Sequence, residues 1–467
     1  MTDRTGTLNR VPRISGEALP SDGWSGVRLD ANPSLRLRVA LHPAIIEWAM
    51  LESLNTFVLS ALVLLSGGIA CFFIGKWLGL RPMMSLSLAF WHISLGYYHA
   101  SYVLENGGDA FTYYQKAQFD FVEPTLGTGF IVWLSSFPVS LGFSYWSLSL
   151  LYNILGTIGL LAFCAALRGT PIAAGSVYGR FVVLVCCFLP SVSFWTSGIG
   201  KDSLGFLSVG LFLWATMNLA RRQLVAIAAI LIMLPVRPHI AALMVLSAAA
   251  GTAFVAELRA SVRFGVASLA TAGAVFFVPL ALVYSGTTRF TSIAEYISDR
   301  QEQNLAGGSS IDIAGMDPVS RLLSYLFRPL PNEASGLAQL ATSIDNVVLV
   351  GLTLVALVAL YRAGIVKTFR HYGTALLYGV MALVLLSQVT ANLGLAARQK
   401  WMAVPALMLV LCGALSLAGA EAARRRSRVR GSYFARPGLH RVSPDMLPMV
   451  SAPLRGQRPS GPDGSKA

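Results

Sequence analysis

The chain has 467 residues, of which 55% are hydrophobic and 12% are charged, and its mean hydropathy is +0.61. Soluble domains carry about 25% charged residues, so this composition excludes a water-soluble enzyme. The formal net charge of +14 comes without a basic domain interleaved with aromatic residues, which excludes the usual kind of nucleic-acid-binding protein.

A polar N-terminal extension, residues 1–55, precedes a series of apolar runs that reaches the 410s. The runs are about 16–23 residues long, enough to cross or nearly cross a ~30 Å hydrocarbon layer. We therefore predict an all-α polytopic transmembrane bundle of about eleven spans, within a range of about ten to twelve. In chain order the predicted spans are 56–75, 82–104, 145–167, 181–197, 203–220, 223–236, 239–256, 265–285, 346–361, 373–391 and 401–420.

Two apolar segments depart from this regular pattern. Residues 128–144 are interrupted by Gly and Pro, so they either span the membrane, re-enter it or lie at its interface. The span 223–236 is short, and two prolines flank Arg237 at its end. Proline removes a backbone donor and clashes with the preceding turn, so we predict a tight hairpin between two helices rather than one long helix.

The distribution of Lys and Arg predicts the orientation. Five arginines between Arg424 and Arg430 follow the last span, which predicts a cytoplasmic C-terminus. Counted back from there, the cytoplasmic segments and the tail carry more than twice as many Lys and Arg as the opposite side. Residues 1–55 are basic and yet fall outside. If 128–144 is a true span, the N-terminus moves inside, and residues 107–123 move with it.

The remaining boundaries follow from composition. Residues 56–420 form the predicted transmembrane catalytic domain, in which 286–345 is a long external loop. Residues 421–467 are rich in Arg, Pro, Gly and Ser, which predicts a disordered basic cytoplasmic tail.

Polar residues that interrupt or crowd the ends of spans are informative, because ionisable groups at that depth are costly unless they are used or paired. All five such segments fall on the external side of the predicted topology. They are 106–116, 190–202, 237–239, the loop 286–345 with its Asp317–Glu333 portion, and 392–400.

These segments gather groups that suit an anionic, lipid-anchored, sugar-bearing substrate. A positioned Asp109 can act as general base toward an acceptor hydroxyl. Arg and Lys can clamp a pyrophosphate, Arg with two parallel hydrogen bonds and Lys as a point charge. Tyrosine rings can stack on sugar faces. The predicted substrate-binding residues are Tyr113, Tyr114, Lys201, Asp202, Arg237, His239, Arg328, Arg398 and Lys400.

Each of these residues also has a purely structural interpretation. Asp109 after two glycines could simply cap a helix, Lys201 and Asp202 could be an ion pair that closes a tight loop, and Arg237 could be an interfacial anchor. The Gly198-Ile199-Gly200-Lys201 run lacks the glycine and hydroxyl positions of a phosphate loop, so a nucleotide site is excluded.

The 317–331 stretch places leucines at helical spacing and predicts an interfacial amphipathic helix that supports a site, with Arg328 at its end. His92 and His99 share one face of the second span, where we interpret them as hydrogen-bonding groups between helices. No metal site and no cofactor are predicted, although the sequence leaves a divalent metal open.

At these residues the chain resembles a known family. The Gly-Asp-Ala-x-x-Tyr-Tyr segment from Gly108, the Pro190–Asp202 segment, the Arg-Pro-His turn, the Phe-Arg-Pro-Leu-Pro run and the late Arg-Gln-Lys run look like those of bacterial envelope-polysaccharide proteins. That grouping contains exopolysaccharide and O-antigen repeat-unit polymerases and the related GT-C glycosyltransferases. The resemblance covers roughly residues 56–420, and the order of the segments carries most of its weight.

The resemblance implies a GT-C-like helical fold with interfacial helices in external loops, in the bacterial inner membrane. Asp109 would match an early external acidic residue, while Lys201, Arg237, Arg328 and Arg398 would match cations that hold a polyprenyl-pyrophosphate donor. The expected partners are the polyprenyl-linked glycan, membrane lipids, and a chain-length regulator and flippase of the same pathway. The chain departs from the family in its N-terminal extension and in lacking the paired acidic residues of many GT-C members.

The sequence thus predicts a glycosyltransferase that polymerises lipid-linked repeat units at the periplasmic face. Within the enzyme class, a transferase of single sugars from polyprenyl phosphate and a glycan ligase remain alternatives. Outside it, a flippase or secondary transporter remains open. Transporters usually show two related halves with broken helices and ionisable groups at the midplane, and neither feature is evident here.

Overall fold

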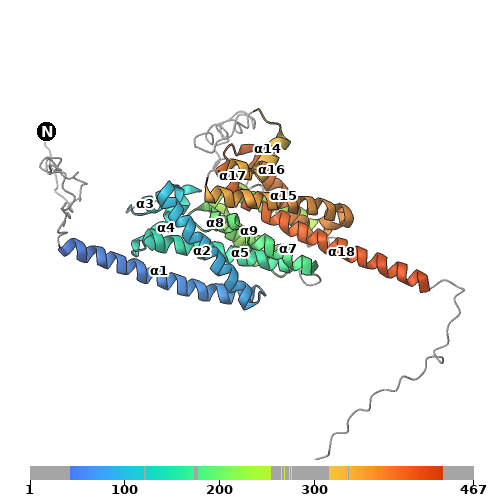
Figure 1. Ribbon diagram of the computed structural model, residues 1–467, viewed down its shortest axis with the longest axis horizontal. Coiled ribbons are helices and arrows are strands. Elements are labelled where there is room, and N and C mark those ends of the chain that lie inside the picture. The colour runs from blue at the N-terminus through green and yellow to red at the C-terminus, as the bar shows by residue number, and fades with distance from the viewer. Residues whose placement is uncertain are drawn as a thin grey trace, which may run out of the picture. The chain divides into compact units, whose positions relative to one another are not determined.

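The computed structural model describes residues 43–434, apart from 120–122, 173–176, 335 and most of 254–314. The chain divides into two units, Met1–Leu54 and Asn55–Ala467, and the account below concerns the second. All regular secondary structure in the described part is helical (Figure 1), as the sequence predicts. The predicted span 265–285 and most of the extension 1–55 lie outside the described residues.

The helices follow one another with short connections. The first group is α1 (Pro43–Trp77), α2 (Pro82–Asn106), α3 (Asp109–Ala117), α4 (Thr128–Ser140) and α5 (Tyr145–Arg168). The second group is α7 (Val177–Cys187), α8 (Pro190–Trp195), α9 (Lys201–Thr216), α10 (Gln223–Val236) and α11 (Pro238–Ala253). The third group is α14 (Pro318–Phe327), η3 (Pro331–Glu333), α15 (Leu337–Ala363), α16 (Ile365–Val389), α17 (Leu393–Gln399), η4 (Lys400–Met402) and α18 (Val404–Phe434).

Six segments are long and apolar enough to cross a membrane, which supports a multi-pass membrane protein. They are Ser53–Trp77, Tyr145–Arg168, Val177–Trp195, Gln339–Ala363, Ile365–Val389 and Val404–Ser427. Helices α4 and α10 are apolar but shorter, with 13 and 14 residues. At 1.5 Å per residue each covers about 20 Å, less than the hydrocarbon thickness. The count of eleven spans therefore remains a prediction.

The helical break at Arg237 agrees with the predicted hairpin. Helix α10 ends at Val236, Arg237 has an extended φ of −148°, and Pro238 begins α11. Helices α10 and α11 then pack against each other. The proline pair therefore places the arginine at a turn, not inside a helix.

Two boundaries differ from the sequence prediction. Helix α15 begins at Leu337, nine residues before the predicted span, because its first turns present polar side chains that packing buries. Helix α18 continues to Phe434, well beyond residue 421, because Ala and Arg favour helix even where hydropathy falls. Residues 435–467 of the predicted disordered tail lie outside the described residues.

Helix α5 lies at the centre of the bundle and packs closely against α9 and α2. Small residues make the approach possible. A methyl group at Gly159 would lie 2.7 Å from the Cα of Leu207, and one at Gly210 would lie 2.1 Å from the carbonyl oxygen of Gly159. Close backbone approach through small residues is the usual way in which helices associate in membranes, where lipid removes the hydrophobic driving force.

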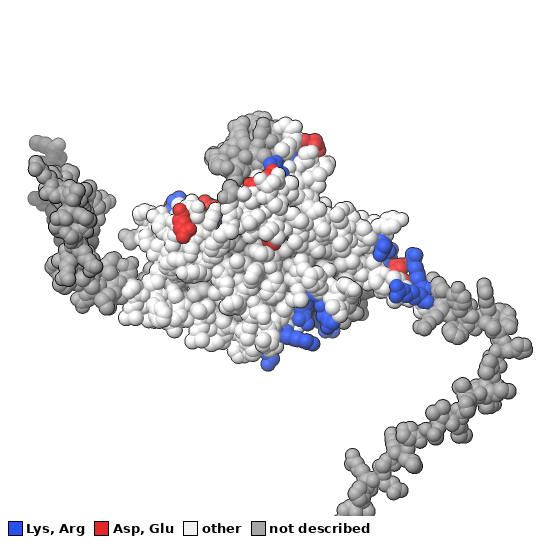
Figure 2. Space-filling model, viewed as in Figure 1, with Lys and Arg blue, Asp and Glu red and all other residues white. Residues whose placement is uncertain are grey.

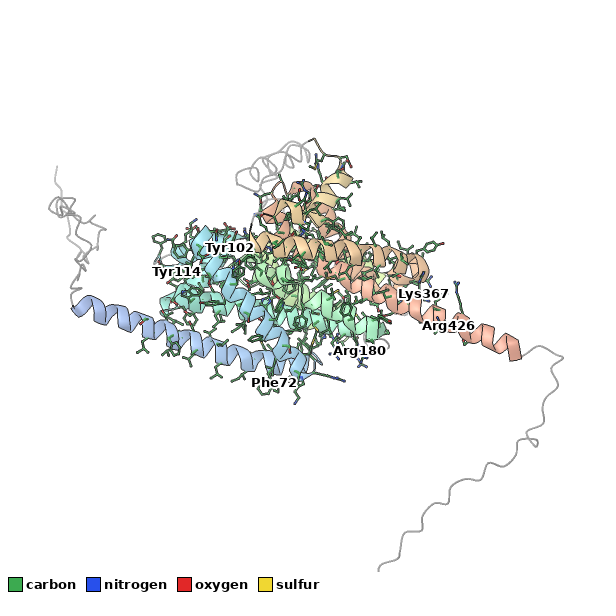
Figure 3. The ribbon with its side chains drawn as sticks, viewed as in Figure 1. Phe72, Tyr102, Tyr114, Arg180, Lys367 and Arg426 are labelled. Atoms are coloured by element: carbon green, nitrogen blue, oxygen red, sulfur yellow. The ribbon has the colours of Figure 1, made fainter. Side chains whose placement is uncertain are left out.

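The turns between helices gather at two ends of the bundle. Tyr102 and Tyr114 lie toward one end, and Arg180, Lys367 and Arg426 lie toward the other (Figure 3). In the same view, Lys and Arg side chains group along the lower and right-hand edges, whereas acidic and basic side chains are mixed along the upper edge (Figure 2). We call these the basic end and the mixed end.

Candidate functional site

The candidate site begins where α2 ends at the mixed end. Gly107 and Gly108 follow the helix with φ angles of 77° and 156°, a region that side chains with a Cβ rarely adopt. This sharp turn lets α3 begin with Asp109, whose side chain is about half exposed. The two glycines therefore direct the carboxylate out of the helical core.

Three of the five polar segments meet around one cavity of about 340 Å³. This volume lies at the low end of the range for small-molecule sites. Its walls come from the α2–α3 turn, the α8–α9 turn and the start of α17. Its lining includes His99, Tyr102, Gly107, Gly108, Asp109, Trp195, Gly198, Gly200, Asp202, Asn392, Leu395 and Arg398.

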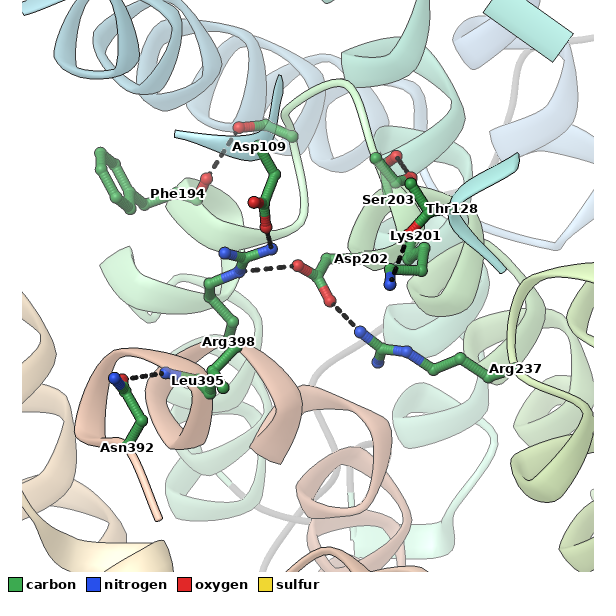
Figure 4. Close-up of polar contacts among 12 residues, drawn as sticks. Asp109, Thr128, Phe194, Lys201, Asp202, Ser203, Arg237, Asn392, Leu395 and Arg398 are labelled. Atoms are coloured by element: carbon green, nitrogen blue, oxygen red, sulfur yellow. Dashed lines mark hydrogen bonds and ion pairs between the residues drawn. The ribbon is translucent and has the colours of Figure 1, made fainter. Parts of the chain in front are cut away.

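A chain of four charged side chains runs along the wall of this cavity (Figure 4). Arg398 donates from Nη2 to Asp109 Oδ2 at 3.1 Å and from Nε to Asp202 Oδ2 at 3.0 Å. The other oxygen of Asp202 accepts a 2.6 Å hydrogen bond from Nη2 of Arg237. One guanidinium thus joins two carboxylates that are 93 positions apart in the sequence.

The inner end of this chain is buried and the outer end is open. The side chains of Arg237 and Asp202 are 8% and 9% exposed, whereas that of Asp109 is 54% exposed. A buried charge is costly unless it is paired, so the Asp202–Arg237 pair is a fixed base for the site. Arg237 Nη1 is buried and has no hydrogen-bond partner among the described residues.

The neighbouring segment α3 also contributes to the wall behind the cavity. Tyr113 is buried, and its ring lies close to Gly200 at the start of α9. Burial, followed by the nearby Asp109 carboxylate, raises the pKa of Tyr113 to about 12, which keeps the phenol neutral. Tyr114 instead packs against Tyr145, with ring centroids 5.9 Å apart. Neither tyrosine is among the lining residues.

Four other predicted site residues lie outside the cavity lining. Lys201 donates from Nζ to Thr128 Oγ1 at 3.3 Å, toward α4. His239 is half-buried one position into α11. Arg328 pairs with Glu333, five residues along the same loop, through Nε at 2.9 Å.

Lys400 lies in the protein interior. It is 0% exposed, and its Nζ donates to Asn346 Oδ1 at 2.7 Å and to the Leu326 carbonyl at 3.1 Å. These contacts connect η4 with α14 and α15. The geometry gives Lys400 the role of a structural tie, although it is only two positions from Arg398.

The structure adds lining residues that the sequence analysis did not assign to a site. His99 lines the cavity, its ring packs edge-on against Phe194 with centroids 5.0 Å apart, and its Nδ1 has no partner among the described residues. Trp195 and Asn392 also line it. The signal for His99 was its position one helical turn or two before the Gly-Gly-Asp turn, which places it near Asp109.

Within the described part of the chain, no group of three or more His, Cys, Asp or Glu side chains is placed to hold a metal ion. The two carboxylates of the cavity both bind the same guanidinium instead. The five cysteines are buried and unpaired. No family model, no curated protein and no solved structure matches this chain.

Proposed function

We propose that the chain is a membrane glycosyltransferase that acts on polyprenyl-pyrophosphate-linked saccharide at the periplasmic face of the bacterial inner membrane and polymerises repeat units of an envelope polysaccharide. The observation that carries the proposal is the Asp109–Arg398–Asp202–Arg237 chain on the wall of one cavity. Its elements are a partly exposed carboxylate, a bridging guanidinium and a buried support, which together suit acid–base chemistry beside an anion.

The reaction requires one bond to form and one to break. The oxygen of an acceptor hydroxyl attacks the anomeric carbon of the lipid-linked sugar, and the bond from that carbon to the pyrophosphate oxygen breaks. Asp109 takes the hydroxyl proton, as a positioned carboxylate can. The polyprenyl pyrophosphate leaves with the bonding electrons, and preorganised cations stabilise the charge that develops on it.

Arg398 connects these two roles. In the structure it is bound to Asp109, a contact that would compete with a proton transfer to that carboxylate. Its Nη1 makes no hydrogen bond with the described residues, so it offers a donor to an arriving phosphate. Phosphate binding draws the guanidinium from Asp109 and frees the carboxylate, while Asp202 keeps the arginine in place through Nε.

Aromatic and polar side chains on the remaining walls suit the sugar. Tyr102 and Trp195 present ring surfaces to the cavity, and such rings stack on the apolar faces of sugars. His99 offers a buried nitrogen without a partner among the described residues. A sugar hydroxyl would satisfy it.

The decisive experiment is analysis of lipid-linked intermediates in a strain that lacks the protein. Accumulation of single complete repeat units supports a polymerase, whereas an incomplete unit indicates a single-sugar transferase. Complementation with Asp109→Asn should restore no polymer, although the protein stays in the membrane. Glu105→Gln, an exposed carboxylate four positions away that does not line the cavity, should restore normal polymer. Normal polymer from Asp109→Asn contradicts the assignment.

A further inference from the structure

A second cavity lies at the basic end of the bundle. It has a volume of about 340 Å³, and its lining includes Gly79, Arg168, Trp214, Asn218 and Arg222. These residues come from three turns that are remote in the sequence: the α1–α2 turn, the end of α5 and the α9–α10 turn. None of these residues belongs to the candidate functional site.

The charge of these three turns is one-sided. Residues 76–81, 168–180 and 217–222 contain six Lys or Arg and no Asp or Glu. Two of those arginines, Arg168 and Arg222, reach the same cavity. Two cations that share a cavity without a carboxylate repel each other, and an anion between them removes that cost.

Arg222 is held in a fixed orientation. Its guanidinium carbon lies 3.8 Å from the centre of the Trp214 ring, and its Nη1 donates to the Trp214 carbonyl at 2.7 Å. Its Nε and Nη2 remain for another acceptor. Trp77 stacks near the other side of this group, with ring centroids of Trp77 and Trp214 4.7 Å apart. Tryptophan at this level is typical of the interface between lipid and water.

An apolar groove leads toward the same turn. It has a volume of about 610 Å³ and lies between α1 and α2, where its lining includes Leu65, Gly68 and Phe72. Their face of α1, continued at the helical spacing of four residues, reaches Lys76. Gly79 of the following turn lines the basic cavity. The two features therefore lie in sequence along α1, apolar first and basic second.

We propose that the basic cavity and this groove together bind one phospholipid, with its phosphodiester between Arg168 and Arg222 and an acyl chain along α1. The charge complementarity favours a headgroup without a cation of its own, such as phosphatidylglycerol. The site is independent of the proposed glycosyltransferase function, and it would anchor the α1–α2 pair to the end of α5.

Native mass spectrometry of the purified full-length protein tests this proposal by titration with phosphatidylglycerol, phosphatidylcholine or inorganic phosphate. We expect one phosphatidylglycerol to bind more tightly than phosphatidylcholine. Arg168→Gln and Arg222→Gln should each weaken its binding about tenfold, the value of one charge-assisted hydrogen bond. Arg168 is exposed and makes no contact that folding requires, so its variant remains interpretable if Arg222→Gln is unstable.

Two further variants identify the source of the phosphate. Gly68→Phe fills the groove, where an added Cβ meets no atom within 4 Å, and it should weaken phosphatidylglycerol binding. Arg180→Gln, at the same end but outside the cavity lining, should bind as the parent protein does. Equal affinity for inorganic phosphate, or unchanged lipid binding in both arginine variants, overturns the proposal.

Discussion

Two charged regions at the mixed end differ in what surrounds them, although one short segment supplies a cation to each. Arg398 in α17 reaches the cavity and binds Asp109 and Asp202. Lys400, two positions later, is fully buried against Asn346 and the Leu326 carbonyl. The comparison shows that charge in this membrane protein has two uses: an open network that a ligand can rearrange, and a closed one that fixes helices.

The buried cluster around Lys400 has a second part. Asp345 is 1% exposed and accepts a 2.6 Å hydrogen bond from the backbone N–H of Ser191 at the start of α8. Asn346 also donates to the Pro329 carbonyl at 2.9 Å. These bonds connect α8, α14, α15 and η4, so the cluster supports the walls of the cavity without lining it.

The largest effect is expected at the centre of the open network. Asp202→Asn removes the negative charge that lies between Arg237 and Arg398, which leaves the buried Arg237 uncompensated. Breaking a buried pair in this way typically costs about 3–5 kcal/mol. We expect lower stability in detergent, measured by SDS-induced unfolding, together with loss of polymer. A variant as stable as the parent would show that the arginines do not need this carboxylate.

A smaller loss of stability, without loss of turnover, is expected in the closed network. Lys400→Met leaves the Asn346 oxygen and the Leu326 carbonyl without their donor, at a cost of about 1–3 kcal/mol. Product formed per folded molecule should stay close to that of the parent protein. Folded but inactive Lys400→Met would move Lys400 from the scaffold into the site and break the comparison.

The converse pattern is expected for Arg398→Lys. The charge is retained at a partly exposed position, so stability should change by less than about 1 kcal/mol. A point charge cannot bridge two carboxylates and a phosphate as the planar fork does. The apparent affinity for lipid-linked substrate should fall about tenfold, measured from initial rates. Unchanged affinity together with reduced stability would assign Arg398 to the scaffold.

The smallest effect is expected in the loop after α14. Arg328 holds the pKa of Glu333 below its ordinary value of 4.5, and the carboxylate accepts from the Leu330 amide at 2.8 Å. Because the folded pKa is lowered, this contact is complete above pH 4.5 and is lost as the pH falls through the folded value. Amide exchange should show protection of Leu330 at neutral pH and its loss in that acidic window. Loss of protection already at pH 6 would contradict the contact.

Much of the fold could be predicted because apolar runs and proline breaks are local signals. The turn at Arg237 follows from the chemistry of two prolines, and the start of α14 follows from Asp317, which accepts from the Val319 amide at 2.9 Å. The start of α15 could not be predicted in this way. Its first turns contain Asp345 and Asn346, whose low hydropathy resembles that of a loop until packing buries them.

The site was predictable to the level of segments but not of side chains. Residues 107–110, 198–202 and 392–398 meet, as expected for polar segments at the same end of the bundle. Whether a cation in 392–400 faces the cavity depends on the turn from α17 into η4, which no local pattern specifies. Arg328 was likewise predicted to bind substrate, but Glu333 lies within reach of it in the same loop.

The central claim is that the cavity at Asp109 forms glycosidic bonds, and reconstituted turnover tests it most directly. The measurement is release of free polyprenyl pyrophosphate from a lipid-linked repeat unit by the purified protein in vesicles. We predict one pyrophosphate released per bond formed, a loss of about 10²–10⁴-fold in Asp109→Asn, and parent-level turnover in Glu105→Gln. Equal turnover by Asp109→Asn, or movement of the lipid across the vesicle without bond formation, would contradict the account.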